Sequence, residues 1–97
     1  IKLMKKTAFL INTSRGKVVN EQHLIKALKD KQIAGVGLDV YEDEPISTSN
    51  PLTHLPQTVL LPHIGSATFR TRSKMAEVSA NNIVNSLIGK GTVYKIK

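Results

Sequence analysis

The sequence predicts an α/β fold, with a partial parallel sheet of about three strands, flanking helices and a long C-terminal helix. Short unbroken apolar runs, which are typical of strands buried in a parallel sheet, alternate with segments whose apolar residues recur at three- and four-residue steps. Strands that alternate with helices pair in parallel through right-handed crossovers. Because such a small parallel sheet leaves its faces poorly covered, we expect the chain to be a piece of a larger α/β protein.

Three strands are expected over residues 7–12, 33–40 and about 58–61, where apolar runs end at polar or turn-forming residues. The first and third are predicted to be buried, because unbroken apolar runs suit strands that are covered on both faces. The first helix is expected from Glu21 to about Lys31, where Asn20 is a favourable N-cap and apolar residues follow at helical spacing.

The connections are predicted from glycine, proline and polar residues. Gly16 ends the turn after the first strand and is free to take a positive φ. Glycines within residues 33–40 weaken strand propensity, and a close backbone approach is the usual reason for keeping them. Residues 47–50 are expected to form a polar loop, and residues 52–55 a short helical turn.

The long helix is expected over residues 67–87, with Ser66 or Thr68 as its N-cap and Gly89 and Gly91 as its end. Roughly twenty helical residues give a rod of about 30 Å, long enough to leave one domain and reach another. Its apolar stripe indicates core or interdomain packing and comprises Ala76, Ala80, Ile83, Val84 and Leu87. The tail, residues 92–97, is expected to be an edge strand or disordered.

Composition excludes several classes of protein. The 97 residues make one small domain or part of one, and the absence of cysteine excludes a disulfide framework and a thiolate metal site. That absence fits a cytoplasmic location, and no apolar run approaches the ~20 residues of a membrane span. The net charge of +7 raises the question of nucleic-acid binding, but the basic residues are spread along the sequence and aromatic residues are few. We therefore expect no nucleic-acid, membrane or metal partner.

Polar residues follow each predicted strand. Arg15 follows the first strand, Asp39 ends the second with Glu44 close behind, and His63 follows the third. The carboxyl ends of parallel strands meet at one edge of a sheet, where ligands bind in open α/β folds. Arginine pairs with a carboxylate through two parallel hydrogen bonds, and histidine exchanges protons near neutral pH. A carboxylate beside that histidine would orient it and favour its charged form.

Three segments together resemble the D-isomer-specific 2-hydroxyacid dehydrogenase family: LINTSRG at 10–16, GLDVYEDEP at 37–45 and LPHIGSAT at 61–68. Within that family the chain is most similar to the glyoxylate/hydroxypyruvate reductases, through residues 63–72 and 80–82. The resemblance covers nearly the whole chain. It implies that residues 1–66 are the C-terminal half of a Rossmann-type NAD(P)-binding domain and residues 67–97 an interdomain helix and tail that return to the substrate domain. It also places the glycine-rich cofactor fingerprint upstream of Ile1, so this piece alone is expected to be inactive.

The resemblance also implies roles for individual residues. His63 would be the acid/base, Glu44 its partner, and Arg15 the catalytic residue that binds the substrate carboxylate and polarises the carbonyl. The cofactor, NAD or NADP, would be bound at its nicotinamide end by Asp39 and His63, and lined by the backbone at Thr13 and Gly65. The substrate would be a small 2-oxo acid such as glyoxylate or hydroxypyruvate, and the full-length protein a homodimer.

Two other functions are compatible with the sequence. An NAD(H)-sensing corepressor-like binding protein of the same fold would keep the same triad of residues. A basic nucleic-acid-binding domain is suggested by the charge alone. For single residues, Glu44 could instead be one of several solvated loop carboxylates, because it lies among other acidic residues before Pro45.

Overall fold

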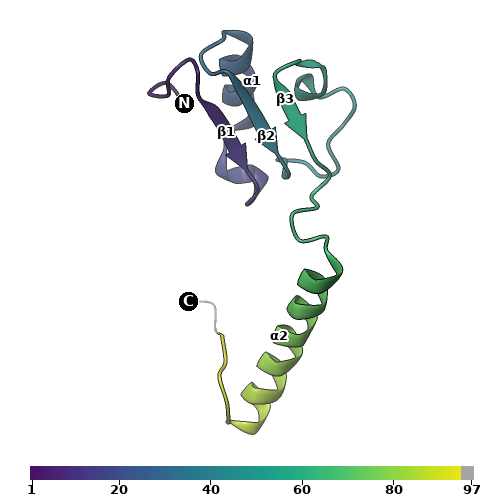
Figure 1. The fold of residues 1–97 in the computed structure, drawn as a ribbon. Coiled ribbons are helices and arrows are strands. Elements are labelled where there is room, and N and C mark those ends of the chain that lie inside the picture. The colour runs from purple at the N-terminus through teal and green to yellow at the C-terminus, as the bar shows by residue number, and fades with distance from the viewer. Residues whose placement is uncertain (95–97) are drawn as a thin grey trace. The chain divides into compact units, whose positions relative to one another are not determined.

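The computed structural model describes residues 1–94 of the chain (Figure 1). The chain divides into two compact units, Ile1–Gly65 and Ser66–Lys97, and each is described by itself. The first unit holds all of the strands within the described residues and the first helix, and the second holds the long helix.

The first unit contains a three-stranded sheet in the order β1-β2-β3, with both pairs of neighbours parallel, as predicted. Strand β1 spans Phe9–Asn12, β2 spans Gly35–Leu38 and β3 spans Thr58–Leu60. The strands lie inside the predicted ranges and are shorter than them. All three arrowheads in Figure 1 point the same way, so the carboxyl ends of the strands lie along one edge of the sheet.

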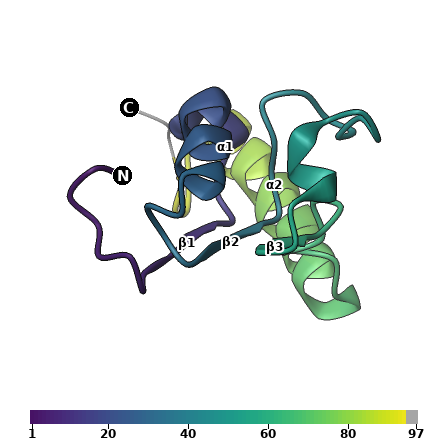
Figure 2. The same cartoon turned by 90° about the horizontal axis from the view of Figure 1, so that it is seen from above.

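Helix α1 (Glu21–Lys29) covers one face of this sheet, together with the short 3-10 helix η2 (Pro51–His54); a second 3-10 helix, η1 (Gly16–Val18), precedes α1. Figure 2 shows α1 and η2 on the same side of the strands. Asn20 caps α1 as expected, because its side-chain oxygen accepts the His23 amide at 2.9 Å. The helix ends before the predicted Lys31, whose φ of 52° is incompatible with a right-handed helix.

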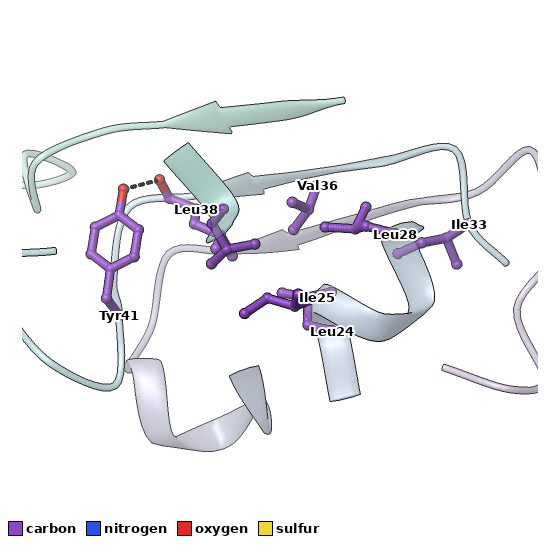
Figure 3. Close-up of a cluster of buried hydrophobic side chains, with 8 residues drawn as sticks. Leu24, Ile25, Leu28, Ile33, Val36, Leu38 and Tyr41 are labelled. Carbon is purple, nitrogen blue, oxygen red and sulfur yellow. Dashed lines mark hydrogen bonds between the residues drawn. The ribbon is translucent and has the colours of Figure 1, made fainter. Parts of the chain in front are cut away.

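The core lies between α1 and the sheet (Figure 3). Leu24 and Leu28 from α1, and Leu52 from η2, are at most 1% exposed. Each such leucine contributes about 1.5–3 kcal/mol of burial free energy, so these side chains fix the helices onto the sheet. The buried cluster comprises Leu24, Ile25, Leu28, Ile33, Val36, Leu38, Tyr41 and Leu52.

The opposite face of the sheet is exposed, which corrects the prediction that the first and third strands are fully buried. Phe9 and Ile11 are each 67% exposed, Val59 is 64% exposed and Leu61 45%. Alternate strand residues point to opposite faces, and within the first unit the helices cover only the other face. The unbroken apolar runs therefore predicted the strands correctly but not their burial within this chain.

Two glycines of β2 lie on that exposed face, where they let β1 side chains approach. A Cβ atom built at Gly35 would lie 3.0 Å from the Phe9 ring, and one built at Gly37 would lie 2.9 Å from Cδ1 of Ile11. The structure thus confirms a close approach as the reason for these strand glycines.

The second unit consists mainly of α2 (Phe69–Ile88), a helix of 20 residues that matches the predicted long helix. Thr68 caps it, with its hydroxyl oxygen accepting the Thr71 amide, and Gly89 ends it with a φ of 66°. None of its residues is buried, so its apolar stripe is exposed in this chain. Residues 92–94 form neither helix nor strand, and the rest of the expected tail strand lies outside the described residues. Within the described part, no helix is long and apolar enough to cross a membrane.

Tyr41 joins the ends of β2 and β3, and this bond can be tested. Its hydroxyl donates to the Leu61 carbonyl at 2.8 Å and lies 3.3 Å from the Leu38 carbonyl. Because one neutral hydrogen bond contributes ~1 kcal/mol to stability, we expect Tyr41→Phe to lower the free energy of unfolding by about that amount in urea denaturation. Tyr94→Phe is the control, since Tyr94 is 70% exposed. Equal stabilities for wild type and Tyr41→Phe would contradict this account.

Candidate active site

The polar residues that follow the three strands lie at one edge of the sheet, as predicted. Arg15 follows β1, Asp39 follows β2, and His63 follows β3, and the strands are parallel neighbours. Side-chain and backbone hydrogen bonds connect the loops that carry these residues. All of them belong to the first unit.

Asp39 is almost fully buried, with 3% of its surface exposed, and both of its carboxylate oxygens bind backbone in the loop after β3. One oxygen accepts the Ile64 amide at 2.8 Å and the other accepts the Gly65 amide at 2.6 Å. A Cβ atom at residue 65 would lie 2.9 Å from Oδ2 of Asp39. Glycine is therefore needed there, and the group that approaches its backbone in this structure is the Asp39 carboxylate.

The backbone of His63 is held in a conformation that non-glycine residues rarely adopt. Its φ is 55°, in the left-handed region, which costs on the order of 1–3 kcal/mol and is common at functional sites. The two hydrogen bonds that the Asp39 carboxylate accepts fix Ile64 and Gly65, the residues that follow His63. On its side chain, Nδ1 lies 2.7 Å from Oε2 of Glu44. The imidazole is thus oriented by a carboxylate on one nitrogen, and 46% of the side chain remains exposed to solvent.

Glu44 is not a free loop carboxylate, because both of its oxygens are engaged. Oε2 pairs with His63, and Oε1 accepts the Tyr41 amide at 3.0 Å. The hydrogen bond with His63, followed by that with the Tyr41 amide, holds the pKa of Glu44 below its ordinary value. The positive charge of Arg15 makes the smallest contribution to this lowering of the Glu44 pKa.

Arg15 lies in a turn that the Asn12 side chain closes. The Asn12 amide donates to the Arg15 carbonyl at 3.0 Å, and its oxygen accepts the Ser14 amide at 3.1 Å. Arg15 itself is exposed, and its guanidinium Nη1 donates to the Ser14 carbonyl at 2.7 Å. Thr13 is likewise exposed at the end of β1.

Gly16 does not use its freedom to take a positive φ, since the glycines with positive φ among the described residues are Gly89 and Gly91. Gly16 is required for a different reason. A Cβ atom there would lie 1.8 Å from the Tyr41 carbonyl oxygen, which leaves no room for a side chain. The turn that carries Arg15 is therefore packed directly against the loop that carries Glu44.

A hollow of about 340 Å³ lies beside the His63–Glu44 pair, and Tyr41, Ile46 and Pro62 are among the residues that line it. This volume falls in the range of small-molecule pockets, roughly 300–1,000 Å³. Tyr41 is mostly buried in the wall, and burial raises the pKa of its phenol, which therefore stays neutral and donates to the Leu61 carbonyl.

The residues at this edge fit the nicotinamide end of a dinucleotide cofactor. Gly65, after β3, presents backbone without a side chain, Thr13 is exposed after β1, and the half-exposed His63 imidazole lines the hollow. The chain contains no glycine-rich loop for the phosphates, because Gly35 and Gly37 lie within β2 and no third glycine and helix follow them. The described residues therefore account for one end of such a cofactor site.

Sequence reasoning missed two residues of this site. Asn12 lay inside a quoted motif without a role, although asparagine at the end of a strand is a known signal for a side-chain-closed turn. Tyr41 gave no signal of its own, because its phenol bonds to a residue 20 positions away. Both act on backbone, which sequence patterns alone do not reveal.

Comparison with protein families matches residues 1–65 to the model of the D-isomer specific 2-hydroxyacid dehydrogenase, NAD binding domain. Among curated proteins, the chain is 52% identical over 89 residues to a glyoxylate reductase of Thermofilum pendens, covering 92% of the chain and 26% of that protein. It is 49% identical over 94 residues to the human glyoxylate reductase/hydroxypyruvate reductase, covering 97% of the chain and 29% of that protein. The chain thus spans about a quarter of the length of these relatives.

Solved structures give the same result. A glyoxylate reductase from Paecilomyes thermophila matches with a TM-score of 0.82 and 39% identity, over 95% of the chain and 27% of that structure. An NADPH-dependent glyoxylate/hydroxypyruvate reductase from Sinorhizobium meliloti, in complex with NADP and malonate, matches with a TM-score of 0.76 and 40% identity, over 82% of the chain and 25% of that structure. These matches confirm the Rossmann-type fold.

The contribution of the Glu44 carboxylate to stability should depend on pH. Because its pKa is lowered in the folded state, the stabilisation is present above the ordinary value of 4.5 and is lost as the pH falls through the folded-state pKa. We therefore expect Glu44→Gln to lower the melting temperature at pH 7, with the difference from wild type shrinking below about pH 4.5.

The measurement is thermal unfolding of both proteins between pH 7 and pH 3. Asp43→Asn is the matched control, because Asp43 is an exposed acidic residue in the same loop. A Glu44→Gln difference that stays constant over the whole range would show that the substitution acts through packing and not through charge.

Proposed function

Because the chain belongs to the D-isomer specific 2-hydroxyacid dehydrogenase family, we propose that the complete protein is an NAD(P)-dependent oxidoreductase. It reduces a small 2-oxo acid, such as glyoxylate or hydroxypyruvate, to the 2-hydroxy acid. The observation that carries the proposal is the 2.7 Å pair of His63 and Glu44, placed beside a hollow at the carboxyl edge of the sheet, where Arg15 is also exposed.

His63 acts as the acid in the reductive direction and as the base in the oxidative one. With Nδ1 held by Glu44, Nε2 is the ring nitrogen left to give a proton to the carbonyl oxygen of the substrate. Glu44 orients the imidazole through its bond to Nδ1. When bound, the nicotinamide supplies the hydride that reduces the carbonyl carbon.

Arg15 binds the substrate carboxylate and polarises the neighbouring carbonyl. Its guanidinium is exposed at the same edge, and it offers the planar fork that matches a carboxylate in two parallel hydrogen bonds. One of its nitrogens already donates to the Ser14 carbonyl, which leaves the other donors for the substrate.

The backbone at Thr13 and Gly65, with His63, lines the nicotinamide end of the cofactor, and Asp39 belongs to the same end. Since the Asp39 carboxylate is 3% exposed and bound to the Ile64 and Gly65 amides, its action on the cofactor runs chiefly through the backbone that it holds. The cofactor is NAD or NADP, and solved relatives include an NAD-complexed form as well as complexes with NADP and NADPH.

The rest of the proposal concerns the complete protein. Residues 1–66 form the C-terminal half of its NAD(P)-binding domain, and residues 67–97 return to the substrate domain through α2. The exposed apolar stripe of α2 supports this role, because it provides a surface for packing on another domain. We expect a cytoplasmic homodimer, and we expect the 97-residue piece to be inactive because it lacks a phosphate-binding loop.

The test is reduction of glyoxylate and hydroxypyruvate by the complete protein, followed as NADH or NADPH consumption. His63→Asn should lower kcat by about 10²-fold or more, which is the usual contribution of a positioned acid/base. His54→Asn is the matched control, since His54 lies in η2 away from the site. Unchanged turnover in His63→Asn would remove this residue from the acid/base role.

Arg15→Lys tests recognition of the carboxylate. Lysine keeps the positive charge but replaces the fork with a single point of contact. We expect KM for glyoxylate to rise about tenfold or more, with a smaller change in KM for the cofactor. The measurement is steady-state kinetics with each substrate varied in turn, and equal KM values for glyoxylate would argue against a bidentate contact.

A further inference from the structure

The two buried polar side chains among the described residues both lie at the carboxyl ends of strands. Asp39 is 3% exposed and Asn12 is 6% exposed. Asp39 holds the loop that carries His63, as described above. Asn12 has the corresponding place at the end of β1, directly before the turn that carries Arg15.

We propose that Asn12 is a positioning residue for Arg15 and that it thereby determines how tightly the enzyme binds the carboxylate of its substrate. The proposal rests on the proposed function, because it assumes that Arg15 binds this carboxylate. Asn12 itself touches neither substrate nor cofactor in this account.

The first support is the pair of bonds that Asn12 makes with the turn. Its Nδ2 donates to the Arg15 carbonyl at 3.0 Å, and its Oδ1 accepts the Ser14 amide at 3.1 Å. These two backbone groups lie on either side of the peptide bond between Ser14 and Arg15. One buried side chain thus holds the backbone on both sides of the Ser14–Arg15 peptide, next to the Cα atom that carries the Arg15 side chain.

The second support is that the guanidinium is tied to the same peptide. Nη1 of Arg15 donates to the Ser14 carbonyl at 2.7 Å. This carbonyl belongs to the peptide that lies between the two groups bound by Asn12, so the direction of the carbonyl also bears on where the guanidinium lies. A rotation of this peptide would therefore move the fork as well as the backbone.

The third support is that Asn12 and the turn are anchored to the neighbouring loop. The Asn12 carbonyl accepts the Asp39 amide at 3.0 Å, which fixes the end of β1 to the end of β2. On the far side of Arg15, Gly16 packs against the Tyr41 carbonyl with no space for a side chain. The backbone of the turn that carries Arg15 is therefore fixed to the loop after β2, which also carries Glu44, and Asn12 is the side chain that holds this turn closed.

The chemistry explains why position matters here. A bidentate contact requires both guanidinium nitrogens to meet both carboxylate oxygens, and a displacement of about 1 Å at a positioning residue can cost up to ~10²-fold in rate. Asparagine is suited to the task because one side chain supplies a donor and an acceptor. Aspartate would keep the acceptor for Ser14 and lose the donor for Arg15.

The experiment measures steady-state kinetics of the complete protein with Asn12→Ala and Asn12→Asp. We expect KM for glyoxylate to rise about tenfold or more in Asn12→Ala, with KM for the cofactor within about twofold of wild type. With methyl glyoxylate, which lacks the negative carboxylate, the variant and the wild type should differ by less than about twofold in kcat/KM. Asn12→Asp should show the same pattern, and it serves as the second variant if Asn12→Ala does not fold.

Asn50→Ala is the matched control. The Asn50 side-chain oxygen accepts the Leu52 amide at 2.9 Å, which is the same kind of turn at the N-terminus of η2. We expect normal KM values in this variant. In an Arg15→Ala background, Asn12→Ala should change KM for glyoxylate by less than about twofold, since two residues that act through one contact are not additive.

A second measurement is independent of turnover. The NMR resonance of the Arg15 side-chain Nε–H should shift or broaden in Asn12→Ala and stay unchanged in Asn50→Ala. If the wild type reduces no 2-oxo acid, the proposed function fails, and this resonance still decides whether Asn12 positions Arg15. An unchanged resonance, or equal losses of kcat/KM with glyoxylate and with its methyl ester, would overturn the inference.

Discussion

The Asp39 carboxylate accepts two backbone amides from the loop after β3, and the rest of the site depends on this contact. A buried carboxylate is costly unless its oxygens are hydrogen-bonded, and here each oxygen has a backbone partner. The contact holds Ile64 and Gly65, the two residues after His63. With these residues fixed, His63 keeps its left-handed backbone and its side chain reaches Glu44. Tyr41 adds a second bond between the ends of β2 and β3. The loops that end the three strands are therefore one connected structure.

Acidic side chains at the site end of the sheet are held by hydrogen bonds. Glu44 binds His63, and Glu42 and Glu21 each accept a backbone amide of the other, at 2.8 and 3.4 Å. Glu21 begins α1, where negative charge is favourable. The guanidinium of Arg15 is exposed at the same edge, and its planar fork suits a carboxylate.

Each unit exposes apolar side chains, on one face of the sheet in the first unit and along α2 in the second. The covered face carries a dense core of leucine, isoleucine and valine side chains, which fixes the register of the strands. Phe9 and Ile11 on the other face are laid against the glycines of β2 and remain 67% exposed. Within the first unit, the positions of the strand-end loops thus depend on the core that packs against one face of the sheet. The chain spans about a quarter of its relatives' length.

The sequence by itself determined the order of the strands and helices, the parallel sheet and the edge at which Arg15, Asp39, Glu44 and His63 gather, because apolar periodicity and caps are local signals. It also predicted the pairing of Glu44 with His63 through resemblance. Only the tertiary structure decided which sheet face is covered, why residue 16 is glycine, and that Asp39 and Asn12 hold backbone. These outcomes depend on groups that are distant in sequence, such as Asp39 and Gly65, whose contact requires a fold to bring them together.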